Sequence, residues 1–129
     1  IHLVTVTVKQ LKSMLKYMLR DEAFEGDHTE FYQLSDGMYL EYDRKTKKID
    51  KFTINKKAVK DDNTYKLGLQ KYHFINMQEG FNITLDELEK NSKSRVVATS
   101  CRDVIEEYLS NNQLLDIDIE ENPRLVVKK

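Results

Sequence analysis

A short aromatic segment, from Lys71 to Phe81, carries the side chains of this sequence that are best suited to chemistry. Its functional members are Tyr72, His73, Phe74, Glu79, Gly80 and Phe81. An aromatic ring can stack on a purine or pyrimidine, and a carboxylate can accept hydrogen bonds from both hydroxyl groups of a ribose. A glycine directly after the acid indicates a backbone bent for a close approach. The segment therefore suits a nucleoside, with ordinary core packing of the rings as the alternative.

The histidines and the single cysteine do not indicate a further catalytic or metal site. His73 could act as an acid or a metal ligand, but no Cys or Asp lies at a useful spacing, so we expect a packed or surface histidine. Cys101 falls on the apolar stripe of a helix, where core packing is expected in place of a reactive thiol. One cysteine and three histidines give no zinc-binding spacing, so we expect no metal cofactor in this chain.

Two charged groups of residues could bind ions. The first is a set of lysines in turns and on a strand, Lys45, Lys47, Lys48, Lys51, Lys56 and Lys57. The second is a set of acids, Asp116, Asp118, Glu120 and Glu121. Acids are interspersed with the lysines, and the second set alternates with apolar residues, as one face of a strand does. We therefore expect solvated faces, with phosphate and calcium binding as the alternatives.

The composition is that of one domain with its own core, with 129 residues, 40% of them hydrophobic and 33% charged. The 21 basic side chains balance 22 acidic ones, so no overall field attracts nucleic acid or an anionic membrane. No apolar run approaches the roughly 20 residues of a membrane span, and no signal peptide is recognisable. Because the chain begins at Ile1, inside an extended run, we expect an N-terminally incomplete piece of a parent protein that is cytoplasmic or secreted.

Apolar periodicity and a cap predict that a strand over residues 2–6 runs directly into a helix, which ends near Arg20 or Asp21. Thr7 and Gln10 have the spacing of a capping box at the start of this helix. The stripe that the helix should bury is Leu11, Met14, Leu15, Met18 and Leu19.

The middle of the chain predicts an antiparallel meander. Residues 31–34 and 38–43 read as a hairpin around Asp36-Gly37, whose glycine supplies the positive φ of the turn. A basic turn separates them from a strand at 49–54. Further strand-like runs cover residues 65–69, 95–98, 115–119 and 124–127.

Helix caps at Thr84 and Ser100 predict two more helices. The second carries an apolar stripe made of Cys101, Val104, Ile105, Tyr108 and Leu109. Because strands and helices do not alternate regularly, the fold class is α+β, with a mixed, mostly antiparallel sheet and helices packed on it. Residues 1–129 should form a single domain.

Several short motifs follow one another along almost the whole chain. They are Val4-Thr5-Val6-Thr7 with Gln10-Leu11-Lys12, Tyr32-Gln33-Leu34-Ser35-Asp36-Gly37-Met38, Tyr39 to Asp43, Asp62-Asn63-Thr64-Tyr65-Lys66-Leu67, Ser100-Cys101-Arg102-Asp103-Val104 and Pro123-Arg124-Leu125. Their order resembles the C-terminal domain of the 5'-nucleotidase family, which includes UDP-sugar hydrolases and 2',3'-cyclic nucleotide phosphodiesterases. The resemblance implies the fold of that domain.

The resemblance also implies roles within the aromatic segment. In the family, a loop reading Asn-Phe-Leu-Ala-x-Gly-Gly-Asp-Gly-Phe stacks its first aromatic residue on the nucleobase, and its Asp contacts the ribose. Tyr72 falls on the stacking position, Glu79 on the acid, and Gly80 with Phe81 on the closing pair. Met77-Gln78 replaces the two glycines, and one extra residue precedes the acid, so we expect the loop to follow a different path.

By this resemblance, the chain is the nucleotide-recognition domain of a 5'-nucleotidase-type metallophosphoesterase that hydrolyses nucleotide phosphate esters. The dinuclear divalent metal site belongs to an N-terminal domain of the same polypeptide, so this chain should contribute no catalytic residue and be inactive alone. One alternative is an interaction or scaffold domain of the same fold that no longer binds nucleotide. Another is a freestanding enzyme built on His73 and Glu79.

Overall fold

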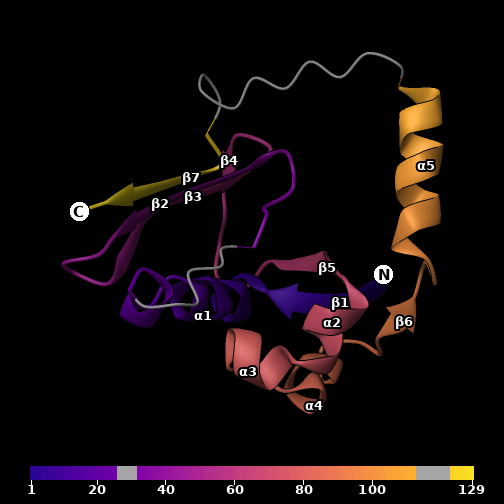
Figure 1. Cartoon of the computed structure of the whole chain (residues 1–129). Coiled ribbons are helices and arrows are strands. Elements are labelled where there is room, and N and C mark those ends of the chain that lie inside the picture. Colours follow the sequence, from indigo (N-terminus) through magenta and orange to yellow (C-terminus); the bar gives the residue numbers. More distant parts are fainter. Residues whose placement is uncertain (26–31, 113–122) are drawn as a thin grey trace.

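The computed structural model of the chain describes residues 1–25, 32–112 and 123–129 and has the α+β architecture that the sequence predicts (Figure 1). The helices are α1 Val8–Met18, the 3-10 helix η1 Asp21–Ala23, α2 Lys71–Ile75, α3 Met77–Phe81, α4 Leu85–Glu89 and α5 Cys101–Asn111. The strands are β1 His2–Thr7, β2 Met38–Asp43, β3 Lys48–Ile54, β4 Lys57–Ala58, β5 Thr64–Leu69, β6 Arg95–Val96 and β7 Leu125–Lys128.

The strands of the described residues form two sheets. In the first sheet, β1 lies between β5 and β6 and is antiparallel to both. In the second sheet the order is β4-β3-β2-β7, with β7 parallel to β2 and the other pairs antiparallel. The sheets are thus mixed and mostly antiparallel, as predicted, but they are two separate sheets where the sequence suggested one.

The passage from β1 into α1 is fixed by the predicted capping box. The Thr7 hydroxyl accepts a hydrogen bond from the Gln10 backbone N–H at 3.1 Å, and the Gln10 side-chain oxygen accepts one from the Thr7 backbone N–H at 2.9 Å. Both bonds satisfy donors that the first turn of a helix leaves without partners. Because the strand leads straight into the helix, the direction of β1 sets the direction of α1.

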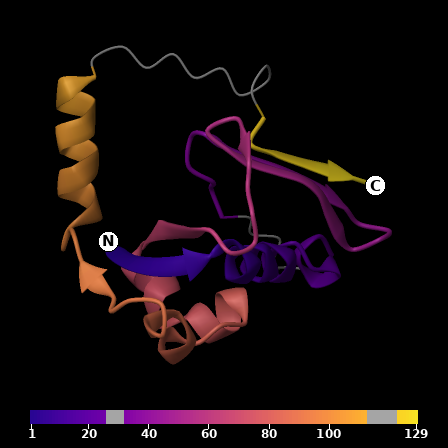
Figure 2. The same cartoon turned by 180° about the vertical axis from the view of Figure 1, so that it is seen from behind.

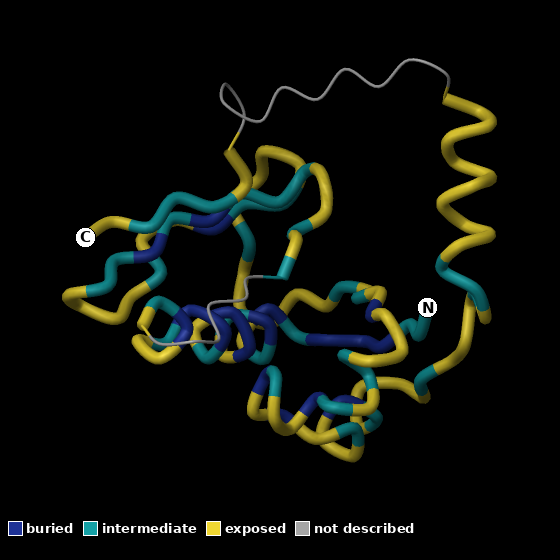
Figure 3. The backbone as a smooth tube through the Cα atoms, in the orientation of Figure 1, coloured by how far each residue is buried: buried dark blue, intermediate teal, exposed yellow. Residues whose placement is uncertain are grey.

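Helix α1 is the centre of the hydrophobic core. It packs against β3 of the second sheet and against α3 (Figure 1, and from behind in Figure 2). Figure 3 shows the buried backbone concentrated on α1 and β1. The buried residues of α1 and the residue after it are Val8, Leu11, Met14, Leu15, Met18 and Leu19. They contain the predicted stripe, so the periodicity of this helix was interpreted correctly.

The predicted hairpin across Asp36-Gly37 is wrong. Residues 32–35 are not a strand, and Phe31 lies outside the described residues. The physical reason is that β3 and β7 occupy both edges of β2, which leaves no edge for another partner. The Leu34 carbonyl instead accepts a hydrogen bond from Arg124 Nη1 at 2.7 Å. The hairpin partner of β2 is β3, across the basic turn.

The expectation that α5 buries its apolar stripe is also wrong. None of the residues of α5 is buried in the described structure, and Cys101 is only partly buried. The helix stands apart from the other described elements in both views (Figures 1 and 2). The strand predicted at 115–119 and the acidic set Asp116, Asp118, Glu120 and Glu121 lie outside the described residues. Among the described helices, none is long and apolar enough to cross a membrane.

The turn before β2 gives a stability test with a built-in control. Gly37 has φ +82°, and a Cβ added there would clash with the Asn55 side-chain oxygen. Gly37→Ala should therefore lower the free energy of unfolding by about 1–2 kcal/mol. The control is Gly68→Ala, because a Cβ at that strand position would meet only Ile1 Cγ2 at 3.7 Å. Urea denaturation should separate the two variants, and equal midpoints would contradict the strained turn.

Candidate functional site

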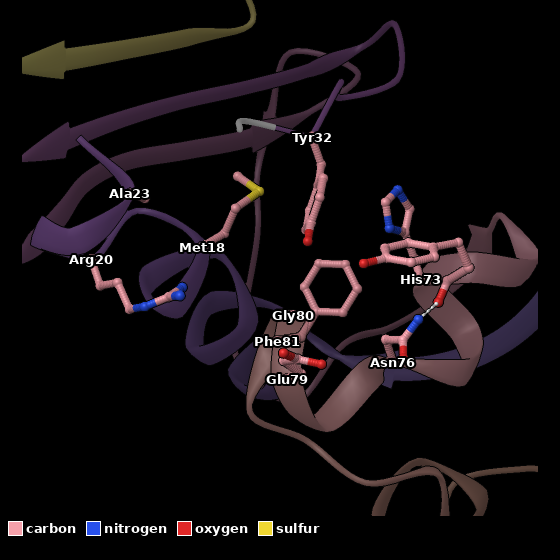
Figure 4. Close-up of a pocket in the computed structure, with 10 residues that line it drawn as sticks. Met18, Arg20, Ala23, Tyr32, His73, Asn76, Glu79, Gly80 and Phe81 are labelled. Atoms are coloured by element: carbon pink, nitrogen blue, oxygen red, sulfur yellow. Dashed lines mark hydrogen bonds between the residues drawn. The ribbon is translucent and has the colours of Figure 1, made fainter. Parts of the chain in front are cut away.

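The described structure contains a pocket of about 560 Å³ beside the C-terminal end of α1 (Figure 4). Such a volume lies in the range of small-molecule sites. Its walls come from the end of α1 and the turn after it, from Tyr32, and from α2 and α3. The lining residues are Met18, Arg20, Ala23, Tyr32, Tyr72, His73, Asn76, Glu79, Gly80 and Phe81. All four residues that the sequence singled out for ligand binding, Tyr72, Glu79, Gly80 and Phe81, are in this set.

The segment that was expected to be an irregular loop is instead two short helices. Helices α2 and α3 meet at Asn76, whose side-chain and backbone N–H groups both donate to the Tyr72 carbonyl, at 2.9 and 3.0 Å. The physical reason is an apolar pair one helical turn apart. Met77 and Phe81 are both buried against the core, so α3 is held on α1. A loop with glycines at 77 and 78 would lack one of these two anchors.

Helix α2 is fixed to the first sheet by ring stacking. The rings of Phe74 and His2 lie 4.0 Å apart with 13° between their planes. Phe74 therefore faces β1, and Tyr72, two residues earlier in the same helix, lies on a different side of α2. Tyr72 is 66% exposed, so its ring is accessible to a ligand.

An aromatic cluster forms one wall of the pocket. The ring of Tyr32 lies 4.2 Å from that of His73 and 5.2 Å from that of Phe81, and the rings of Tyr72 and His73 meet edge to face at 5.5 Å. Phe81 is only 8% exposed, so it is part of the core as well as the pocket wall. The alternative of core packing is therefore correct for the ring of Phe81 and not for that of Tyr72.

Gly80 allows the close approach that the sequence indicated, and the neighbour is Tyr32. A Cβ built on Gly80 would lie 3.2 Å from the Tyr32 hydroxyl oxygen, which is tighter than ordinary van der Waals contact. The missing side chain thus lets Tyr32 stand against α3. This arrangement brings a residue from far upstream into the pocket wall.

Two charged groups with opposite signs line the pocket. Glu79 comes from α3, and Arg20 comes from the turn after α1, on the side of the pocket away from His73 and Asn76 (Figure 4). The Arg20 guanidinium donates to the Tyr17 carbonyl at 2.9 Å and lies over the Tyr17 ring at 4.2 Å. These contacts hold the cation in place at the pocket edge. Sequence reasoning missed Met18, Arg20, Ala23 and Tyr32, because only tertiary packing brings them to α3.

His73 is held neutral by its surroundings. Its Nδ1 atom is buried and has no hydrogen-bond partner among the described residues. Burial lowers the pKa of the imidazole from its ordinary value of 6.5. The histidine is packed, as expected, but it also lines the pocket. Near neutral pH it offers the pocket an uncharged ring.

Of the two charged sets that could bind ions, only the lysine set lies within the described residues. In the described parts of the chain, no three His, Cys, Asp or Glu side chains gather closely enough to hold a metal ion. Of the lysine set, Lys47 pairs with Asp21 and Lys51 lies over the Tyr39 ring at 5.2 Å. Both are surface contacts with neighbouring side chains.

Comparison with known proteins adds no further assignment: no family model and no curated protein matches the sequence.

The burial of His73 predicts a measurable loss of stability in acid. The folded protein binds a proton at His73 more weakly than the unfolded chain, because its folded pKa is the lower one. The free energy of unfolding should therefore fall as the pH drops below about 6.5 and passes through the folded pKa. In His73→Gln this part of the loss should be absent, as measured by urea denaturation at about pH 7 and about pH 5. The same acid loss in both proteins, or an NMR titration midpoint of His73 above 6.5, would contradict the assignment.

Proposed function

We propose that the pocket binds the nucleoside part of a nucleotide and that this chain is the substrate-recognition domain of a 5'-nucleotidase-type metallophosphoesterase. The observation that carries the proposal is the exposed ring of Tyr72 on the rim of a pocket that also contains the Glu79 carboxylate. The sequence resemblance expects a stacking ring and a ribose-binding acid at these two positions, and both side chains line one cavity.

The chemistry of the pocket suits a flat ligand with polar edges. Because Tyr72 is exposed, a nucleobase that stacks on its ring would displace water from the ring surface. The Asn76 amide and the Arg20 guanidinium also line the pocket and could bond to the base edge or to a sugar oxygen. The Glu79 carboxylate oxygens would accept hydrogen bonds that the ribose hydroxyl groups donate.

The segment that contains Glu79 differs from the family's glycine-rich loop, so Glu79 would reach the ribose from a different backbone position than the family's Asp does. Glu79 is one methylene longer than aspartate, and it projects from a helix in place of a flexible loop. A helix holds the carboxylate in a narrower range of positions, so less entropy is lost when the sugar binds. We propose that the longer acid compensates for the different backbone path of the segment.

In the parent enzyme, binding of the nucleoside by this pocket would orient the substrate for hydrolysis. Binding of the base and ribose, which do not react, would hold the phosphate ester at the metal site of the N-terminal domain. The metals would polarise the phosphoryl group and supply hydroxide, and this chain's residues would bind and position the substrate. On this account the isolated chain binds nucleosides without hydrolysing nucleotides.

Nucleotide titration of Tyr72 variants tests the proposal. Tyr72→Ala should weaken binding of adenosine or uridine 5'-monophosphate by about 1–3 kcal/mol, which is about 5- to 150-fold in Kd, because stacking on the ring is lost. Tyr72→Phe keeps the ring and is the matched control, so its affinity should stay within about threefold of the unchanged protein. Isothermal titration calorimetry of the parent enzyme measures both.

The same titration examines the alternative of an interaction domain that has lost its ligand. Tyr39 lies on the second sheet, away from the pocket-lining set, so Tyr39→Phe serves as a second control for general effects of tyrosine substitution. If the unchanged parent binds nucleotide and Tyr72→Ala binds it with equal affinity, the pocket is not the recognition site. If none of the proteins binds nucleotide, the scaffold reading replaces the proposal.

A further inference from the structure

The Asn76 side chain lies one helical turn beyond Tyr72, on the same side of α2. The Asn76 backbone N–H donates to the Tyr72 carbonyl at 3.0 Å, so the turn between the two residues is helical. Residues four apart on a helix are neighbours on its surface, and the later side chain leans back over the earlier turn. Both residues line the pocket. A flat ligand that stacks on the Tyr72 ring therefore has its edge near the Asn76 amide.

A hydrogen bond fixes which end of the Asn76 amide is available to a ligand. The Asn76 Nδ2 atom donates to the Tyr72 carbonyl oxygen at 2.9 Å, as the dashed line in Figure 4 shows. A carbonyl oxygen only accepts hydrogen bonds, so the amide cannot be turned around to place Oδ1 there. Among the described residues, Asn76 Oδ1 has no hydrogen-bond partner, and it is not a buried atom. The amide therefore presents an accessible acceptor next to the stacking ring.

An accessible acceptor at this position recognises a donor on the edge of the base. The exocyclic amino group of a nucleobase is such a donor, and it lies in the plane of the ring. The neighbouring His73 Nδ1 atom is buried, so it does not compete with Asn76 for this group. Glu79 comes from the next helix, where we propose that it binds the ribose.

We propose that Asn76 Oδ1 accepts a hydrogen bond from the exocyclic amino group of the nucleobase, so that the pocket prefers nucleosides whose base carries this group. The inference rests on the proposed function, because it starts from a base stacked on Tyr72. Stacking alone selects poorly among bases, since every base has a π-face. Asn76 adds a contact that depends on the identity of the base.

The preference has a physical cause in the water that the base displaces. A base with the amino group replaces the water on Oδ1 by its own hydrogen bond. A base without the group removes the water and leaves Oδ1 without a partner. A neutral hydrogen bond of this kind changes the dissociation constant by about 2- to 12-fold.

A nucleoside pair that differs in one group tests the inference in the chain of residues 1–129. Adenosine carries the amino group, and purine riboside lacks only that group. In an NMR titration, the unchanged chain should bind adenosine about 2- to 12-fold more tightly, and Asn76→Ala should lose this preference. Gln78→Ala is the matched control, because Gln78 is an exposed amide on α3 outside the pocket-lining set. The control should keep the full preference.

Asn76→Asp separates recognition of the base from support of the helix junction. Aspartate keeps an acceptor oxygen at the same position but loses the N–H group that bonds to the Tyr72 carbonyl. The variant should therefore keep at least about half of the preference for adenosine. If the amide only supported the junction, Asn76→Asp would lose the preference as Asn76→Ala does. Asn76→Ser, which is too short to reach the base, replaces Asn76→Ala if that variant does not fold.

Three results would overturn the inference while adenosine still binds. One is equal affinity of the unchanged chain for the two nucleosides. The second is a preference for adenosine that Asn76→Ala retains in full. The third is an equal loss of preference in Asn76→Asp and Asn76→Ala. Each of these leaves the Tyr72 titration to decide the proposed function separately, whereas a chain that binds neither nucleoside contradicts both proposals.

Discussion

The burial of α1 is the constraint on which the rest of this structure depends. The helix follows β1 without a loop, and its apolar residues pack between the second sheet and α3. Five of its residues are at most 5% exposed, Val8, Leu11, Met14, Leu15 and Met18. No other element of the described chain buries as many apolar residues. Each fully buried apolar side chain contributes about 1.5–3 kcal/mol. Anything that moves α1 moves both sheets.

The pocket is a consequence of how α1 ends and how α3 docks on it. Met18 lines the pocket from the last turn of α1, and Arg20 lines it from just after the C-cap residue Leu19. Met77 and Phe81 hold α3 in place, which sets the positions of Glu79 and Gly80 between them. The site is therefore built on packed helices, with the exposed Tyr72 as its most accessible ring. Such support preorganises side chains for binding.

The parts predicted correctly from the sequence are those determined by local chemistry. The caps at Thr7, Thr84 and Ser100 all form, because the interacting atoms lie within four residues. The failures are tertiary. Residues 32–34 of the predicted strand do not pair with β2, because β3 and β7 already occupy both of its edges. The apolar stripe of α5 predicted a buried helix, but no residue of α5 is buried in the described structure. The four positions that we propose to bind the ligand were predicted from a resemblance, and all four line the pocket. The opposite wall, including Arg20, comes from elements whose packing no local pattern encodes.

The central claim is that a nucleobase lies flat on the ring of Tyr72, and intermolecular nuclear Overhauser effects test it most directly. With adenosine 5'-monophosphate bound, the base protons should show cross-peaks to the Tyr72 ring protons and upfield ring-current shifts, and the ribose protons should show cross-peaks to the Glu79 methylene groups. Cross-peaks from the bound base to protein protons outside the pocket, with none to Tyr72, would contradict the account.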